Sequence, residues 1–237
     1  MNQNGIHDSD IALVCKNIVG VLKDYLTLKE ECAAVNQKKG MDFNPLLYIP
    51  IKEPVHSKII GDFLNPRGSH GQGPLFLQCF LERFDVPQRD LGTWQISIET
   101  DRVDIRLWRE ESREFPASMI LIESKVKDAN DMRNQIFRYW HHQMYRWKPK
   151  HWQDEETRRS FRLIYLTTDK SKAPEQHSLE RPADWDDRIN EHLTVPLKCE
   201  TFSLRELIEL WTKALEQVPD TNHRLHVFLH LYKELWL

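Results

Sequence analysis

The chain has 237 residues, of which 40% are hydrophobic and 29% are charged. This apolar share is enough to form a core and excludes a wholly disordered protein, and we expect a single domain over residues 1–237. The 33 Lys and Arg residues nearly balance the 36 Asp and Glu residues. The resulting net charge of −3 does not by itself indicate a nucleic-acid-binding protein.

The cysteines and the N-terminus argue against two further classes of protein. The four cysteines are widely spaced and form no CxxC pair, so neither a disulfide framework nor a zinc knuckle is indicated. The N-terminus is polar and acidic, and no apolar run approaches the ~18 residues of a membrane span. We therefore expect no membrane partner and a cytoplasmic protein.

The first third of the chain is predicted to be helical. Apolar residues recur at helical spacing over residues 8–36, after a capping cluster at residues 8–10. A second helix is predicted from about Pro54, because proline is favoured in the first helical turn. After a Gly-rich loop, apolar residues at helical spacing resume at Leu75.

Strands are predicted next, and helices follow them. Three short apolar runs form a predicted meander: Trp94 to Glu99, Arg102 to Trp108 and Met119 to Lys125. A helix over residues 129–147 then leads to a strand from Phe161 to Leu166, and a right-handed crossover makes that strand parallel to the third. Two closing helices are predicted within residues 203–236, and the first begins with a Ser203–Glu206 capping box.

The third predicted strand carries a carboxylate and an ammonium group on one face. Side chains alternate along a strand, so Leu121, Glu123 and Lys125 share a face. Asp104 is a lone acid in the preceding apolar run. Carboxylates suit Mg²⁺ or Mn²⁺, which phosphodiester hydrolysis uses to neutralise developing charge, and a nearby lysine can orient the attacking water. We therefore predict that Asp104 and Glu123 hold a metal and that Lys125 is catalytic.

Several motifs resemble those of a known family. RVDI at residues 102–105 and ESK at residues 123–125 resemble the second and third motifs of the PD-(D/E)XK nuclease superfamily. The segment EPVHSKIIGDFLNPRGSHGQGPLFLQCFL resembles the opening of a prokaryotic branch of that superfamily, and NQIFRYW and LIYLT agree as well. The resemblance covers residues 44–168. It implies a restriction-endonuclease-like α/β core, with a mixed sheet of about four to five strands flanked by helices and with extra helices over residues 8–36 and 203–236.

The resemblance also implies further site residues. Glu53 would add a third carboxylate to the metal site, with His56 one turn later as a catalytic residue. Gln135, as a catalytic residue, and Tyr139 would face the site from the crossover helix. The spacing within each pair supports this independently, because 53 and 56 share one helical face and so do 135 and 139.

A local cluster of basic and aromatic residues predicts where a polynucleotide binds. Basic residues outnumber acidic ones between residues 133 and 162, and aromatic side chains lie among them. The residues predicted to bind nucleic acid are Arg138, Tyr139, Arg146, Lys148 and Lys150. The alternative is that the aromatic residues belong to the core and that the charges form a solvated rim.

Other interpretations of these residues remain open. Asp104 could pair with Arg102 or Arg106, and Glu123 with Lys125 could form a simple exposed pair at a sheet edge. A zinc site at His141 and His142 is disfavoured, because adjacent helical side chains diverge by about 100°.

The main prediction for function is an Mg²⁺-dependent endonuclease that acts on DNA. A catalytically silent nucleic-acid-binding or regulatory module on the same fold is the alternative, but Asp104, Glu123 and Lys125 are all present. Cleavage of both strands by an enzyme with one site would favour a two-fold homodimer.

Overall fold

A computed structural model describes residues 8–39, 43–100, 102–113, 116–125, 130–145, 152 and 154–236. The chain divides into two compact units, Met1–Tyr48 and Ile49–Leu237. The predicted single-domain organisation over residues 1–237 stays a prediction. Among the helices of the described ranges, none is long and apolar enough to cross a lipid bilayer.

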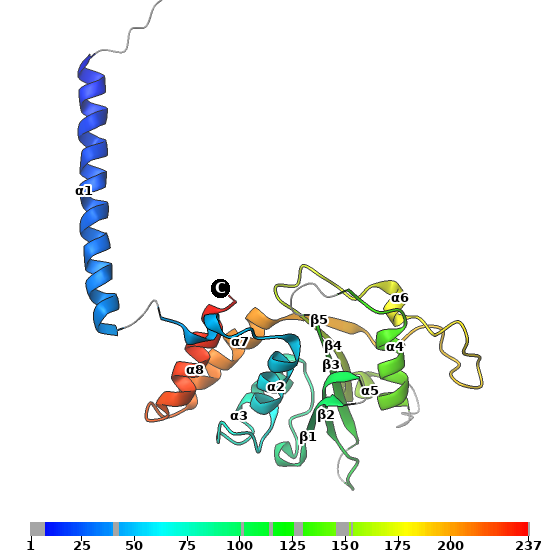
Figure 1. Cartoon of the computed structure of the whole chain (residues 1–237). Coiled ribbons are helices and arrows are strands. Elements are labelled where there is room, and N and C mark those ends of the chain that lie inside the picture. The colour runs from blue at the N-terminus through cyan, green and yellow to red at the C-terminus, as the bar shows by residue number, and fades with distance from the viewer. Residues whose placement is uncertain are drawn as a thin grey trace, which may run out of the picture. The chain divides into compact units, whose positions relative to one another are not determined.

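The second unit is built on a five-stranded mixed sheet with the strand order β1-β2-β3-β4-β5 (Figure 1). The β1, β2 and β3 strands pair antiparallel, whereas β4 pairs parallel with both β3 and β5. This confirms the predicted meander, the parallel fourth strand and the mixed α/β fold class. The strands are β1 (Gln95–Thr100), β2 (Val103–Arg109), β3 (Ser118–Lys125), β4 (Phe161–Thr167) and β5 (Cys199–Ser203).

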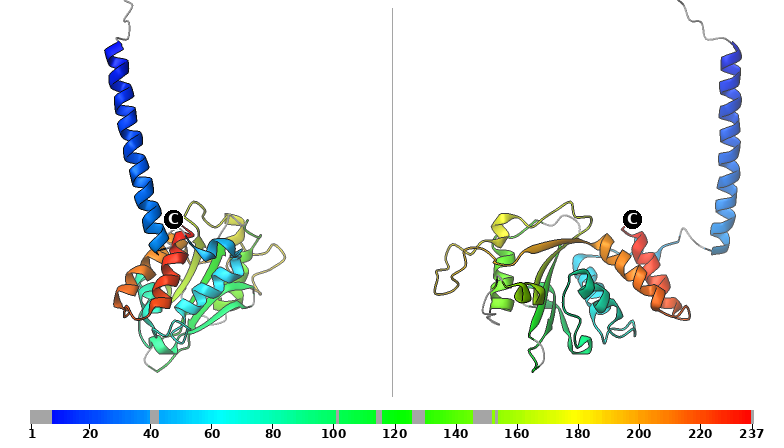
Figure 2. Two further views of the ribbon diagram at one scale, coloured as in Figure 1. Left: turned by 60° about the vertical axis from the view of Figure 1, so that its left-hand side comes forward. Right: turned by 180° about the vertical axis from the view of Figure 1, so that it is seen from behind.

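Helices cover both faces of this sheet (Figures 1 and 2). One face carries α2 (Glu53–Leu64), α3 (Leu75–Arg83), α7 (Leu204–Ala214) and α8 (His223–Glu234), and the capping box at Ser203 begins α7 as predicted. The other side carries α4 (Gln135–Tyr139), the π-helical turn η3 (Trp140–Met144), α5 (Glu155–Ser160) and α6 (Gln176–Leu179). The sheet is therefore the middle layer of a three-layer unit.

Two details differ from the sequence-based expectation. The β5 strand was not predicted, because its sequence CETFS is short and largely polar and gains its strand form by pairing with β4. The helix expected over residues 129–147 begins later, because α4 starts at Gln135, and it continues as η3 to Met144; residues 129, 146 and 147 lie outside the described residues. A π-helical turn shifts the face that the following residues present, and such turns are frequent at functional sites.

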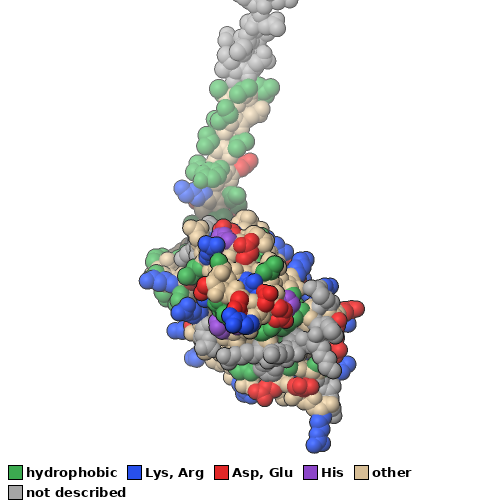
Figure 3. Space-filling model, turned by 90° about the vertical axis from the view of Figure 1, so that its right-hand side faces the viewer, with side chains coloured by type: hydrophobic (Ala, Val, Ile, Leu, Met, Phe, Trp, Pro, Cys, Tyr) green, Lys and Arg blue, Asp and Glu red, His purple; other side chains and the backbone are tan. Residues whose placement is uncertain are grey.

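The first unit contains α1 (Asp8–Lys39). The helix was predicted over residues 8–36 from apolar residues at helical spacing, and the structure extends it to Lys39. Apart from half-buried Asn36, every described side chain from Leu13 to Lys38 is exposed. Figure 3 shows hydrophobic side chains spread along this helix.

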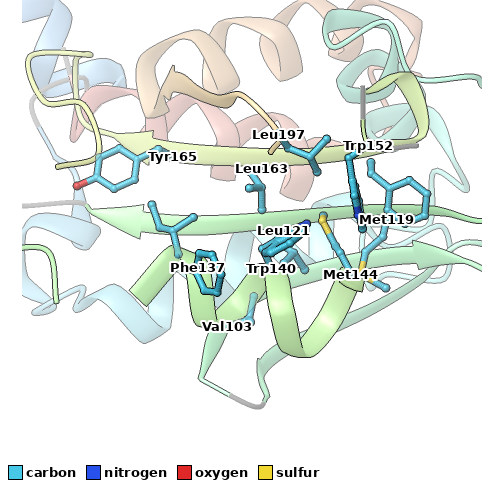
Figure 4. Packing of buried hydrophobic residues seen from close by; sticks show 12 residues of the cluster. Val103, Met119, Leu121, Phe137, Trp140, Met144, Trp152, Leu163, Tyr165 and Leu197 are labelled. Atoms are coloured by element: carbon cyan, nitrogen blue, oxygen red, sulfur yellow. The ribbon is translucent and has the colours of Figure 1, made fainter. Parts of the chain in front are cut away.

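A core of aromatic and aliphatic side chains fixes α4 and η3 against the sheet. Phe137 and Trp140 are fully buried and pack with Leu121 of β3 and with Leu163 and Tyr165 of β4 (Figure 4). Truncation of such a large aromatic side chain to alanine typically costs about 3–5 kcal/mol. This packing sets the direction in which the polar face of α4 points.

Candidate active site

Glu123 and Lys125 lie on the central strand of the sheet. Each side chain is 6% exposed, and Lys125 Nζ lies 2.7 Å from Glu123 Oε1. The alternative of an exposed pair at a sheet edge is therefore wrong, because β3 has β2 on one side and β4 on the other. A buried ion pair needs further hydrogen bonds to offset its loss of hydration.

Asp104 is held beside this pair by the sheet. Ile105 pairs with Ile122, and the same antiparallel register carried one residue further brings Asp104 opposite Glu123. Asp104 Oδ2 accepts a 2.6 Å hydrogen bond from the backbone N–H of Ser124. The sheet therefore brings the two carboxyl groups and the lysine together, as the sequence predicts.

Gln135 connects the pair to α4. Its Nε2 donates to Glu123 Oε1 at 2.7 Å, and its Oε1 accepts from Lys125 Nζ at 3.2 Å. The same amide nitrogen lies 2.7 Å from the Tyr139 hydroxyl oxygen. Gln135 and Tyr139 thus occupy the place that the resemblance implies for them, and Gln135 holds both members of the ion pair in one geometry.

The pKa of each of the three charged groups in this cluster is raised. The pKa of Asp104 is raised, first by loss of hydration and then by the nearby Glu123 carboxylate. The pKa of Glu123 is also raised by burial, which Lys125 only partly offsets. Burial acts to lower the pKa of Lys125, but the carboxylates of Glu123, Asp131 and Glu53 outweigh it and the pKa is raised. The raised pKa values of the two carboxyl groups show that the neighbouring positive charge is too small to stabilise both in the ionised form. A bound cation would supply that charge.

The residues present fit a divalent cation. Glu123 Oε2 is buried and has no hydrogen-bond partner within the described ranges. This carboxylate oxygen is therefore available as a ligand for a cation. No group of three or more His, Cys, Asp and Glu side chains in those ranges is arranged to hold a metal. Mg²⁺ does not need three, since one or two carboxylates are its usual protein ligands and water and phosphate oxygens supply the rest.

Glu53 and His56 occupy different surroundings on α2. Glu53 is half-buried in the first turn of α2, and burial raises its pKa although Lys125 acts to lower it. The effect of Lys125 shows that Glu53 lies close enough to interact electrostatically with the site. His56 is buried against α8: its Nδ1 lies 2.8 Å from the Tyr232 hydroxyl oxygen and its ring packs on Trp236. A catalytic role for His56 stays a prediction.

Glu53→Gln tests whether Glu53 contributes charge to the metal site. We expect this variant to need a higher Mg²⁺ concentration for half-maximal cleavage and to recover full turnover at saturating Mg²⁺, because an amide keeps the shape but loses the charge. A metal titration of cleavage measures the shift. If Glu53 only begins its helix, the titration midpoint stays unchanged and stability falls by about 1 kcal/mol or less.

A cleft of about 870 Å³ opens on the α4 side of the sheet. Gln135 and Tyr139, which contact Glu123 or each other, form part of its wall. The remaining lining residues are largely basic or polar: Arg102, Arg106, Met132, Arg133, Arg138, His142 and Gln143. A polyanion in this cleft would therefore meet four guanidinium groups beside Gln135, whose amide is hydrogen-bonded to Glu123.

The residues that line this cleft differ in part from those that the sequence predicts to bind nucleic acid. Arg138 and Tyr139, which the sequence predicts to bind nucleic acid, line this cleft. Arg146, Lys148 and Lys150 lie outside the described residues. The sequence interpretation missed Arg102 and Arg106 as binding residues and treated them as partners of Asp104. The sequence offered a signal for both, because Arg102, Asp104 and Arg106 alternate along the predicted strand and would share a face. In the structure β2 begins at Val103, so Arg102 lies in the turn before it.

Arg106 is held within the cleft by neighbours on both sides. Its guanidinium carbon lies 4.3 Å from the ring centroid of Trp108, and its Nη1 donates to Gln143 Oε1. Its Nε is buried and has no hydrogen-bond partner within the described ranges. A guanidinium fixed by stacking and one amide keeps donors available for phosphate oxygens.

Comparison with known proteins gives one match. A family model described as the PD-(D/E)XK nuclease superfamily matches residues 43–234, which is most of the chain. No curated protein and no solved structure matches significantly. The matched range contains the entire second unit except its last three residues, and with it all of the candidate site.

Proposed function

Because the chain belongs to the PD-(D/E)XK nuclease superfamily, we propose that it is a metal-dependent endonuclease that hydrolyses phosphodiester bonds in DNA. The observation that carries this proposal is the buried Glu123–Lys125 pair beside Asp104, joined through Gln135 to an arginine-lined cleft. A prokaryotic origin and a cytoplasmic location stay predictions.

Each group of residues in the site has a separate role in the proposed hydrolysis. Asp104 and Glu123 would hold Mg²⁺ or Mn²⁺, which when bound neutralises charge on the phosphoryl oxygens and lowers the pKa of a bound water. Lys125 orients the attacking water and stabilises the charge of the transition state, and Gln135 keeps its ammonium group in place. The cleft arginines position the polynucleotide by its phosphates.

One experiment tests the proposal directly. The purified chain is incubated with supercoiled, linear and single-stranded DNA and with RNA, each with Mg²⁺, Mn²⁺ or EDTA. We expect cleavage of DNA with either metal and none with EDTA, and conversion of supercoiled to nicked or linear DNA identifies endonucleolytic cleavage. Binding without cleavage under every condition would instead identify a catalytically silent nucleic-acid-binding module, and preferential cleavage of RNA would contradict a DNA substrate.

Substitution of a cleft arginine should weaken binding without setting a sequence preference. Arg133→Gln and Arg138→Gln each remove one charge from the cleft wall. We expect each variant to bind DNA more weakly and to reduce the slope of log affinity against log salt by about 1, because each phosphate contact releases a counterion. Fluorescence anisotropy at several salt concentrations measures this slope.

The matched control for this measurement is Arg188→Gln. Arg188 is 91% exposed, pairs with Asp186 and does not line the cleft. The control removes the same charge and should leave the salt slope nearly unchanged. If Arg133→Gln and Arg138→Gln behave like the control, the cleft is not the binding surface.

We further propose that the chain acts as a homodimer. Each chain has one candidate site, and a two-fold pair presents two sites to the two antiparallel strands of a duplex. Linear product that appears without accumulation of nicked circles would support paired cleavage.

A further inference from the structure

The α1 helix exposes apolar side chains along its whole described length. It has 32 residues, which corresponds to roughly 48 Å. Leu13 and Val21 are 59% and 70% exposed, and Leu28 near the other end is 59% exposed. A long helix is rarely stable in water without a partner for its apolar face, so α1 needs something to cover it.

The spacing of these side chains is that of a coiled coil. Counted from Val14, apolar side chains recur after four and three residues in turn, which is the heptad pattern. The positions named a are Ile18, Tyr25 and Cys32, and the positions named d are Val14, Val21, Leu28 and Val35. All seven are exposed in the single chain. Leu22, at an e position, flanks this seam and widens it.

The charges beside the seam match a second, parallel copy of the same helix. In a parallel pair, each g residue lies near the e residue five positions later on the other helix. Asp24 is a g residue and Lys29 is the following e residue, so this contact is attractive and occurs twice. An antiparallel pair overlapping along its full length would instead bring Asp24 near Asp24 of the other copy.

The composition of α1 favours a protein partner over a lipid surface. Its 32 residues contain five Lys and five Asp or Glu, so the helix carries no net charge. Helices that lie on membranes are typically rich in basic residues on their polar face. A neutral helix with a heptad seam and a complementary g–e pair is typical of helix–helix association.

We propose that α1 forms a parallel, in-register coiled coil with α1 of a second copy of this chain. This interface would hold two copies of the Ile49–Leu237 unit in one assembly. The proposal rests on α1 alone and does not depend on nuclease activity, so it is tested by mass and cross-linking and not by cleavage.

The first test is the mass of the full chain in solution, measured by light scattering after size exclusion. We expect two chains for the unsubstituted protein and one chain for Val21→Glu/Leu28→Glu, which places charge at two d positions. The matched control, Thr27→Glu/Gln37→Glu, adds the same charge at c and f positions and should stay associated. A single-chain mass for the unsubstituted protein, or equal behaviour of the two variants, overturns the proposal.

The second test concerns the charge pair. Asp24→Lys and Lys29→Asp each create two repulsive contacts in a homodimer and should raise its dissociation constant about tenfold. A mixture of the two variants restores both attractive contacts, so affinity should return. No recovery in the mixture overturns the parallel register.

The third test uses Cys32, which lies at an a position and would face Cys32 of the second copy. A mild thiol oxidant should link the chains in pairs, because facing a residues lie within disulfide reach. Cys32→Ser should abolish the link and Cys15→Ser should not. Loss of the link in Cys15→Ser would show an antiparallel arrangement and overturn the proposal.

Discussion

Asp104→Asn and Glu123→Gln are each expected to reduce DNA cleavage by about 10³-fold or more. The metal stabilises the transition state by several kcal/mol, and about 1.4 kcal/mol corresponds to a factor of ten in rate. Each substitution removes one ligand charge while it keeps the shape of the side chain. Single-turnover cleavage of plasmid DNA measures the rate, and calorimetric titration with Mn²⁺ should show weakened metal binding in both variants.

The free energy of unfolding, measured against pH, separates a loss of cleavage caused by the missing ligand from one caused by unfolding. A carboxyl group whose pKa is raised in the folded state contributes stability below its unfolded pKa, and that contribution is lost as the pH rises through the folded pKa. Burial and Glu123 raise the pKa of Asp104 from 3.8 to about 8, so the metal-free protein should lose stability progressively between about pH 4 and pH 8. The amide of Asp104→Asn cannot ionise, so this variant should lose less stability over the same pH range.

A surface acid supplies the control for the cleavage experiment. Asp186 is exposed and pairs with Arg188 outside the candidate site. Asp186→Asn removes the same charge and should cleave DNA at the unsubstituted rate. Asp104→Asn or Glu123→Gln with near-normal cleavage would remove that residue from the catalytic centre.

Lys125→Gln is expected to separate turnover from metal binding. We expect cleavage to fall by about 10²–10³-fold, because the variant lacks the charge that stabilises the transition state. Metal affinity should stay the same or increase, since Lys125 Nζ lies 2.7 Å from Glu123 Oε1 and competes with a cation for that oxygen. The glutamine amide retains a hydrogen-bond donor for Glu123, which limits the cost of breaking a buried ion pair.

Calorimetric titration and single-turnover cleavage, performed on the same Lys125→Gln preparation, measure the two effects. Lys170→Gln serves as the control, because Lys170 pairs with Glu206 and is substantially exposed. Equal loss of metal affinity and turnover in Lys125→Gln would contradict its assigned role and would indicate that Lys125 organises the metal ligands.

The sequence by itself determined the strands that carry the central residues. Asp104 and Glu123 are isolated acids within short apolar runs that are rich in β-branched residues and bounded by polar breakers, and this pattern predicts strands. The alternation of side chains along a strand also placed Glu123 and Lys125 on one face. These are local properties of the chain, so the three adjacent strands and the candidate triad could be predicted without a structure.

Only the tertiary structure decided the features that depend on distant segments. The β5 strand forms through its pairing with β4. The cleft is lined together by Arg102, which precedes β2, by Arg106 of β2, and by Arg133 and Arg138 at and before α4. The exposure of α1 was likewise not decided by its pattern, because an apolar helical stripe fits a packed core as well as a coiled coil. Contacts between residues far apart in the sequence depend on how the layers pack, and local patterns do not carry that information.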